Sequence, residues 1–246
     1  ITLEQLKKKN HAVLLSLGLQ LGRSTRIPGS DHKHVQKAVT LLQKIAAGEK
    51  IDVPKTAAII GGGNVAMDIA RSLARLQKQK FGEVNITVTA MESFEHFLAD
   101  PEEVKEAQEE GVIILPSRGP QECMIEKGAL VGLRTLKVLS IFDEQGRFAP
   151  HFDENDEICH ECETIVEAIG QMTDVDLLGE ELTEKLEWQR GRLQVDENCR
   201  TSEDWLWAAG DMVRGPDVVH AVADGHTVSK SINEYLKTLQ MEKKSS

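Results

Sequence analysis

Continuous hydrophobic runs alternate with amphipathic stretches along the first half of the chain. The run His11–Gly18 predicts a strand that is buried on both faces. A second run, Thr56–Ile60, leads into three glycines, and the apolar spacing after them predicts a helix over Asn64–Gln79. Strands are also predicted at Asn85–Met91 and Val112–Pro116. Short buried strands that alternate with helices are typical of an α/β protein.

Three further helices are predicted from spacing and from helix-start signals. Apolar residues recur at helical intervals over Val35–Ala47 and over Val218–Leu239. A third helix is expected to begin at Asp100, because Asp can cap it, the following proline suits the first helical position, and the acidic first turn complements the helix dipole. Gly111 ends this helix. We expect Met241–Ser246 to be a frayed tail.

The pattern changes between these elements. Gly119–Phe152 contains turn signals at Glu126–Gly128 and Glu144–Gly146 between β-rich stretches, which predicts an antiparallel excursion. The remaining signals are buried strands at Glu163–Ala168 and Trp205–Ala209, and a hairpin turn at Arg190-Gly191.

The composition narrows the function classes. The 246 residues include 29 Lys and Arg against 40 Asp and Glu, a formal net charge of −11. Such acidity argues against a nucleic-acid or anionic-membrane surface, which needs a basic patch. No apolar run reaches the roughly 18 residues of a membrane span, and no signal-peptide pattern opens the sequence. The four cysteines do not make a disulfide scaffold, so a cytoplasmic location is expected.

The three glycines after the second run fit the form GxGxxA, with Ala66 as its last residue. Between a strand and a helix, this form lets the turn be tight, lets the backbone approach a pyrophosphate, and leaves helix N–H groups for the phosphates. The alternative is a tight turn of an α/β domain that binds no nucleotide. We expect nucleotide binding, through the residues Gly61, Gly62, Gly63, Asn64 and Val65.

A discriminating side chain is expected at the end of the second strand of such a fold. Glu92 stands there and could accept hydrogen bonds from a ribose 2′-OH, which favours NADH over NADPH. A solvated loop acid is the alternative interpretation of Glu92. No Lys or Arg stands at this place to meet a 2′-phosphate, and Arg71 and Arg75 on the preceding helix are expected to be surface residues.

Several motifs together resemble a known family. The sequence is similar to the flavoprotein small subunit of bacterial glutamate synthase and its relatives, which include the NADPH-accepting part of dihydropyrimidine dehydrogenase and related iron–sulfur oxidoreductases. The motifs that carry the resemblance, in order, are IPGSD (Ile27–Asp31), IIGGGNVAMD (Ile59–Asp68), DPEEVKEAQEEGV (Asp100–Val112), EAIGQMTD (Glu167–Asp174), TSEDW (Thr201–Trp205) and WAAGDMVRGPDVVHAVADG (Trp207–Gly225). They span nearly the whole chain.

The resemblance implies a Rossmann-like NAD(P)H-binding domain inserted into part of an FAD-binding domain. It assigns residues 55–162 to the NAD(P)H domain and residues 1–54 and 163–246 to the FAD domain. We therefore expect the two flanking segments to share one sheet system, and the insertion to form a separate, mainly parallel sheet.

The resemblance also implies cofactor contacts in the C-terminal segment. Gly210 and Asp211 match the family's second FAD contact, in which the acid holds the ribityl region, and the helix that begins near Val218 and Val219 would direct its N-terminus at the flavin. Gly170 is a further cofactor-binding residue by this resemblance. The alternative for the Gly-Asp pair is an ordinary turn.

Two departures from the family pattern matter. The family's first GxGxxG, which holds the FAD adenylate, and its N-terminal iron–sulfur cysteines are absent. The chain therefore resembles a fragment whose FAD site is incomplete. In relatives that use NADPH, a pair of arginines follows the second strand, whereas Met91 and Glu92 stand here.

The function implied is hydride transfer from NAD(P)H to FAD, with onward electron transfer through an iron–sulfur domain or partner subunit. The cofactors carry this chemistry, so no catalytic protein residue and no metal ligand is assigned. The alternative is a non-catalytic dinucleotide-binding or subunit-interaction module. Cys159 and Cys162 form a CxxC, which we interpret as two thiols in a connecting hairpin; a redox or zinc role is the alternative. His220 is expected to be packed.

Overall fold

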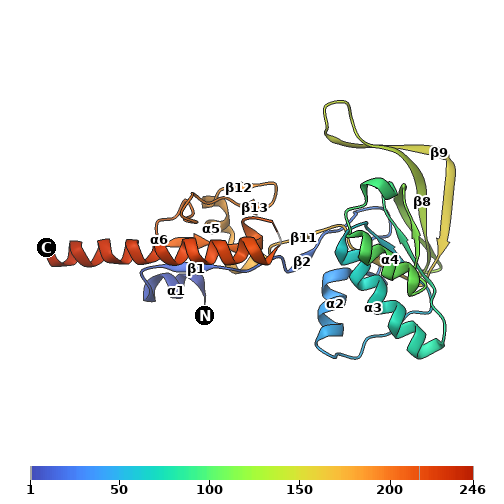
Figure 1. Ribbon diagram of the computed structural model, residues 1–246, viewed down its shortest axis with the longest axis horizontal. Helices are drawn as coiled ribbons and strands as arrows, with labels where there is room; N and C mark the ends of the chain where they lie inside the picture. Colours follow the sequence, from blue (N-terminus) through green and yellow to red (C-terminus); the bar gives the residue numbers. More distant parts are fainter. Residues whose placement is uncertain (1, 216, 246) are drawn as a thin grey trace. The chain divides into compact units, whose positions relative to one another are not determined.

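The chain is organised as two compact units, one of which interrupts the other in sequence. The computed structural model describes residues 2–215 and 217–245. Residues Gly22–Gly170 form an inserted unit, and Ile1–Leu21 with Gln171–Ser246 form a discontinuous unit (Figure 1). The insertion expected from the sequence is therefore present, in a mixed α/β protein.

The boundaries of the insertion differ from the predicted residues 55–162. Residues 22–54 and 163–170 also belong to the inserted unit. The physical reason is strand pairing, because β10 (Thr164–Glu167) lies between β3 (Val35–Lys37) and β4 (Ala57–Ile60) in one sheet. The expectation that the two flanking segments would share a separate sheet system is wrong for these residues.

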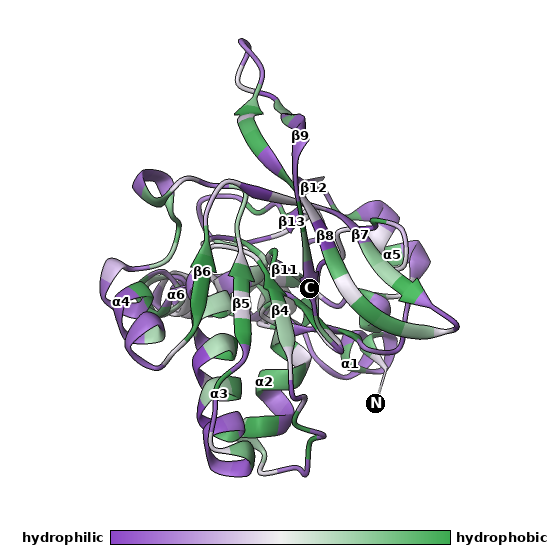
Figure 2. Cartoon of the chain, turned by 90° about the vertical axis from the view of Figure 1, so that its right-hand side faces the viewer, coloured by the Kyte–Doolittle hydropathy of each residue, from purple (hydrophilic) through white to green (hydrophobic). Residues whose placement is uncertain are grey.

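The inserted unit is built on a five-stranded parallel sheet with the order β3-β10-β4-β5-β6, which includes β5 (Ile86–Thr89) and β6 (Ile113–Leu115). Strands β4 and β6 are hydrophobic along their length, and β4 is buried throughout, as a central parallel strand is (Figure 2). Its three α-helices are α2 (Ala38–Ala46), α3 (Asn64–Phe81) and α4 (Pro101–Glu109). Val35–Lys37, predicted as the start of a helix, is strand β3, and the helix begins at Ala38.

The two faces of the parallel sheet pack against different partners. On β4, Ala57 and Ile59 belong to the core formed with α2, α3 and α4. Ala58 and Ile60 point to the opposite face and belong to a second core with residues of the antiparallel strands. The inserted unit therefore has three layers, namely helices, a parallel sheet and an antiparallel sheet.

The predicted antiparallel excursion is a three-stranded sheet with the order β7-β8-β9. Its strands are β7 (Arg118–Glu126), β8 (Ala129–Phe142) and β9 (Phe148–Glu161), joined at the two predicted turns. The β8–β9 hairpin extends beyond the rest of this unit (Figures 1 and 2).

The discontinuous unit contains two short parallel strands, β1 (Val13–Leu15) and β14 (Leu206–Ala208). Trp207 on β14 is fully buried, and its indole N–H donates to the Ser231 hydroxyl at 2.8 Å on the long C-terminal helix α6 (Val218–Ser245). Because α6 continues to Ser245, the expected frayed tail is wrong for residues 241–245; Ser246 lies outside the described residues. The other elements of this unit are α1 (Leu3–Lys9), α5 (Glu180–Lys185) and the hairpin β12 (Trp188–Gln189)–β13 (Arg192–Leu193).

Two further short strands, β2 (Leu21–Gly22) and β11 (Gln171–Met172), form a two-stranded sheet.

Within the described residues, no helix has the length and apolarity needed to cross a membrane.

Candidate functional site

The glycine turn (Gly61–Ala66) leaves β4 at the point where the order of the parallel sheet reverses. From β4 the chain continues to β5 and β6 on one side, whereas β10 and β3 lie on the other side. Ligands of open α/β sheets bind outside the carboxyl ends of the strands at such a switch point. The glycine turn therefore stands where the fold places a ligand.

The first two glycines of the turn are in close contact with the protein itself. Gly61 has φ 139°, and a Cβ there would lie closer than 3.0 Å to the carbonyl oxygen of Ala168, the residue that follows β10. A Cβ on Gly62 would lie 3.0 Å from the Cβ of Ala90 and 3.1 Å from a carboxylate oxygen of Glu92. Gly61 therefore requires glycine, whereas at Gly62 a side chain would be tight against its neighbours.

The third glycine faces open space. No heavy atom lies within 4 Å of the position that a Cβ would take on Gly63. Gly63 is also the N-cap of α3, and no side chain caps this helix end. An uncapped helix N-terminus carries partial positive charge and free N–H groups, which suit a phosphate. The absence of a side chain at Gly63 keeps the approach to this end open.

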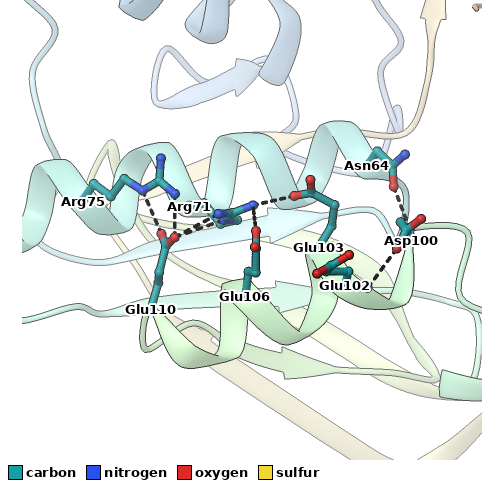
Figure 3. A network of polar contacts seen from close by, with 8 residues as sticks. All are labelled: Asn64, Arg71, Arg75, Asp100, Glu102, Glu103, Glu106 and Glu110. Carbon is teal, nitrogen blue, oxygen red and sulfur yellow. Dashed lines mark hydrogen bonds and ion pairs between the residues drawn. The ribbon is translucent and has the colours of Figure 1, made fainter.

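Asn64 and Val65 contact the protein rather than the open side. The Asn64 side-chain oxygen accepts a hydrogen bond from the backbone N–H of Asp100 at 2.8 Å, which ties the start of α3 to the start of α4 (Figure 3). Val65 packs against the core beneath the helices. Both contacts help to position the turn, and Asn64 remains exposed.

Glu92 follows β5, and its carboxylate lies beside the glycine turn, as the contact with Gly62 shows. Its carbonyl oxygen accepts a hydrogen bond from Ser117 N–H at 2.9 Å, which fixes the backbone at this point. Sequence reasoning missed that Arg118 lies near this turn. Its backbone N–H donates to the carbonyl oxygen of Ala90 at 2.7 Å. Its guanidinium is bound to the Asp156 carboxylate at 2.7 Å.

Of the two arginines of α3, which were expected to be surface residues, only Arg71 departs from the expectation. Arg71 is largely buried in an ion-pair network with three carboxylates of α4, those of Glu103, Glu106 and Glu110 (Figure 3). Arg75 is mostly exposed, as expected, and pairs with Glu110. The hydrogen bond from Arg75 is the main reason that the pKa of the Glu110 carboxyl is lowered. This network docks α4 on α3 and so supports the Asn64–Asp100 contact.

Burial raises the pKa of Asp68, the other acid of this region, and the nearby Glu103 carboxylate adds to the effect. Both arginines of the network, Arg71 and Arg75, are paired with carboxylates of α4 (Figure 3).

Gly210 and Asp211 form a short 3-10 turn, Gly210–Met212, directly after β14. The Gly210 N–H donates to a carboxylate oxygen of Asp224 at 3.0 Å, and the other oxygen of Asp224 accepts from Arg214 at 2.8 Å. Asp224 is almost fully buried on α6. Sequence reasoning missed this acid, although it lies within the motif that ends at Gly225.

Val218 and Val219 are the first residues of α6, and both are 78% exposed. The Asp217 carboxylate accepts a hydrogen bond from the backbone N–H of His220 at 2.8 Å and contacts its ring at 2.5 Å. These bonds lower the pKa of Asp217. His220 is therefore exposed and paired, and the expectation that it is packed is wrong.

Gly170 lies in the inserted unit, at the end of the segment that follows β10. It has φ 103°, in the region that favours glycine, and its carbonyl oxygen accepts a hydrogen bond from Arg23 N–H at 3.0 Å. Gly210 and Asp211 belong to the discontinuous unit.

The cysteines give no metal site. Cys159 is exposed on β9, whereas Cys162 is buried in the core between the sheets, where burial raises its pKa to about 12. Among residues 2–215 and 217–245, no group of three His, Cys, Asp or Glu side chains could hold a metal ion.

Comparisons with known proteins agree with the sequence motifs. The profile of the family described as pyridine nucleotide-disulphide oxidoreductase matches residues 2–225. The NAD-dependent dihydropyrimidine dehydrogenase subunit PreT of Escherichia coli (strain K12) is 32% identical over 239 residues, which are 96% of this chain and 50% of that protein. The glutamate synthase [NADPH] small chain of Azospirillum brasilense is 28% identical over 253 residues, 96% of this chain and 51% of that protein. The chain thus spans about half the length of these curated relatives.

Solved structures show the same fold. The Mycobacterium tuberculosis protein FprA in complex with NADPH superimposes with a TM-score of 0.74 and 16% identity, over 100% of this chain and 67% of that one. The thioredoxin reductase of T. acidophilum gives 0.66 and 16%, over 93% and 66%.

Proposed function

The chain belongs to the pyridine nucleotide-disulphide oxidoreductase family, and we propose that it is the NAD(P)H-binding portion of a flavoprotein oxidoreductase. In this proposal a hydride passes from the nicotinamide to FAD, and the electrons leave through an iron–sulfur domain or a partner subunit. The observation that carries the proposal is the open space in front of Gly63, at an uncapped helix N-terminus on the switch point of the sheet.

The residues fit the nicotinamide nucleotide more completely than they fit FAD. The backbone of the glycine turn would bind the pyrophosphate, and Glu92 would accept hydrogen bonds from the adenosine ribose. For FAD, the discontinuous unit offers Asp211 on a turn that Asp224 fixes, and the exposed start of α6. FAD, when bound, supplies the hydride-accepting ring, whereas the side chains of this chain bind and orient the cofactors.

A flavin titration tests this proposal against a non-catalytic dinucleotide-binding or subunit-interaction module. We expect the purified chain to bind NADH but to carry little FAD, because its residues supply only the ribityl side of that site. Added FAD is then expected to lose its visible absorption when NADH is added, faster in the presence of the chain than without it. NADH binding without any effect on flavin reduction would favour the module. A chain that binds no nicotinamide nucleotide would contradict both the proposal and a dinucleotide-binding module, and would leave the subunit-interaction module.

We also propose that the site prefers NADH to NADPH because of Glu92. A carboxylate about 4 Å from one charge of a 2′-phosphate costs on the order of 4 kcal/mol at an effective dielectric constant of 20, before screening. Even a quarter of this favours NADH several-fold, since about 1.4 kcal/mol is a factor of ten. We expect Glu92→Gln to narrow the ratio of the two dissociation constants and Glu92→Arg to invert it.

Calorimetric titration of both nucleotides measures this ratio. Glu95→Gln is the matched control, because it removes the same charge from an exposed side chain of the same loop and should leave the ratio unchanged. A wild-type chain that already prefers NADPH would refute the preference, as would an equal effect of the Glu95 variant.

A further inference from the structure

Two stacked aromatic rings lie beside the glycine turn, in the loop between β5 and α4. The ring centroids of Phe94 and Phe97 are 5.7 Å apart, with an interplanar angle of 27°. Phe97 is packed against the helix-side core, and its ring comes within 3.5 Å of the Cβ position of Gly62. Phe94 is 50% exposed. The inner ring is thus fixed by the protein, and the outer ring is available to a ligand.

The loop that carries these rings is held in place. Ala99 N–H donates to the carbonyl oxygen of Gly62 at 2.9 Å, which ties the end of the loop to the glycine turn. At its start, the carbonyl oxygen of Glu92 is bound by Ser117 N–H. Between these points, the Ser93 hydroxyl contacts the His96 ring at 2.9 Å. Phe94 is therefore presented by a short, braced segment, with little ordering entropy left to be lost on binding.

The order of groups in a dinucleotide matches the order of these residues. With the pyrophosphate on the glycine turn and the adenosine ribose at Glu92, the adenine lies one group beyond the ribose. Phe94 is two residues after Glu92; its ring is exposed and stacks on Phe97, which contacts the glycine turn. Adenine is flat and uncharged, and bases stack on aromatic side chains whatever their sequence. The acidic side chains of this loop do not oppose a neutral base.

We propose that Phe94 forms a stacking platform for the adenine of the nicotinamide nucleotide, with Phe97 as its support. This inference rests on the proposed nucleotide-binding function and adds a residue that determines affinity for the adenosine half. The nicotinamide half of the nucleotide makes no contact with Phe94 in this arrangement.

The test separates the two halves of the nucleotide. Dissociation constants for NADH, AMP and reduced nicotinamide mononucleotide are measured by calorimetry or competition for the wild type, Phe94→Ala and Phe94→Tyr. We expect Phe94→Ala to weaken NADH and AMP by about tenfold each, to leave the mononucleotide unchanged, and Phe94→Tyr to retain wild-type affinity. Leu98→Ala, which shortens a 72% exposed apolar side chain of the same loop, should change none of the three.

Each outcome decides between explanations. If the wild type binds NADH and Phe94→Ala leaves AMP affinity unchanged, the platform is refuted while the proposed function stands. Equal losses for Phe94→Ala and Leu98→Ala, or an equal loss for the mononucleotide, would show a general disturbance of the loop and also refute it. If the wild type binds neither NADH nor AMP, both the proposed function and the platform fail. Thermal unfolding of each variant checks that the fold is retained.

Discussion

Replacing Gly63 by valine is expected to weaken nicotinamide-nucleotide binding strongly while the chain stays folded. Gly63 has φ −98°, which any residue adopts, and a Cβ there meets no protein atom within 4 Å. The free energy of unfolding should therefore fall by only about 1 kcal/mol, the usual cost of a poor N-cap residue. The valine methyl groups would occupy the space in front of the helix N-terminus. Losing two charge-assisted hydrogen bonds to the phosphates, at about 1.5–3 kcal/mol each, would weaken NADH binding more than a hundredfold.

Gly61→Val, two residues away, is expected to lower the stability of the fold strongly, unlike Gly63→Val. The φ of 139° is strained for any residue with a side chain, and the Cβ would collide with the carbonyl oxygen of Ala168. Backbone strain of about 1–3 kcal/mol and overpacking of a similar size should add. We expect this variant to unfold at clearly lower denaturant concentration than the Gly63 variant.

Denaturant unfolding followed by circular dichroism, together with calorimetric NADH titration, measures both effects. If the turn is assigned correctly, Gly63→Val loses mainly NADH affinity, and Gly61→Val loses mainly stability. If Gly63→Val binds NADH as tightly as the wild type, the pyrophosphate does not lie on this turn. If both variants are equally unstable, a side chain at position 63 meets protein atoms and the space in front of Gly63 is not open.

Features that depend on residues close together in the chain could be predicted from the sequence. The glycine turn and Glu92 each depend on a few neighbouring residues, and the structure places the Glu92 carboxylate beside Gly62. The burial of Arg71 could also have been found. Glu103, Glu106 and Glu110 recur at helical spacing and thus form one acidic stripe, which faces Arg71 (Figure 3).

The domain boundaries could not be predicted because they depend on pairing between distant segments. Strand β3 has three residues, too few for a period of two to be distinguished from the helix that follows it. Its partner β10 lies more than a hundred residues away and inserts beside β4. The contacts of Arg118 with Asp156 and of Asp224 with Gly210 could not be predicted either, because the partners are not adjacent in sequence.

The β3–β10 pairing brings together a buried ion pair whose loss should be among the most destabilising changes in the inserted unit. The Glu167 carboxylate has no exposed surface, and the Lys37 ammonium binds it directly. The carboxylate also accepts hydrogen bonds from the backbone N–H of Thr25 at 2.7 Å and from the Thr25 hydroxyl at 2.5 Å. Removing the ammonium leaves a buried charge that only neutral donors compensate.

We expect Lys37→Met to lower the free energy of unfolding by about 3 kcal/mol, the lower part of the range for broken buried pairs, since Thr25 still binds the carboxylate. Adding Glu167→Gln should restore part of this loss, because a neutral amide can still accept from Thr25 and needs no counter-charge. Lys33→Met removes an exposed lysine from the same segment and should change stability by less than about 0.5 kcal/mol. Urea unfolding of the four proteins decides the point. A double variant no more stable than Lys37→Met alone would show that packing of the lysine chain, and not the buried charge, governs this position.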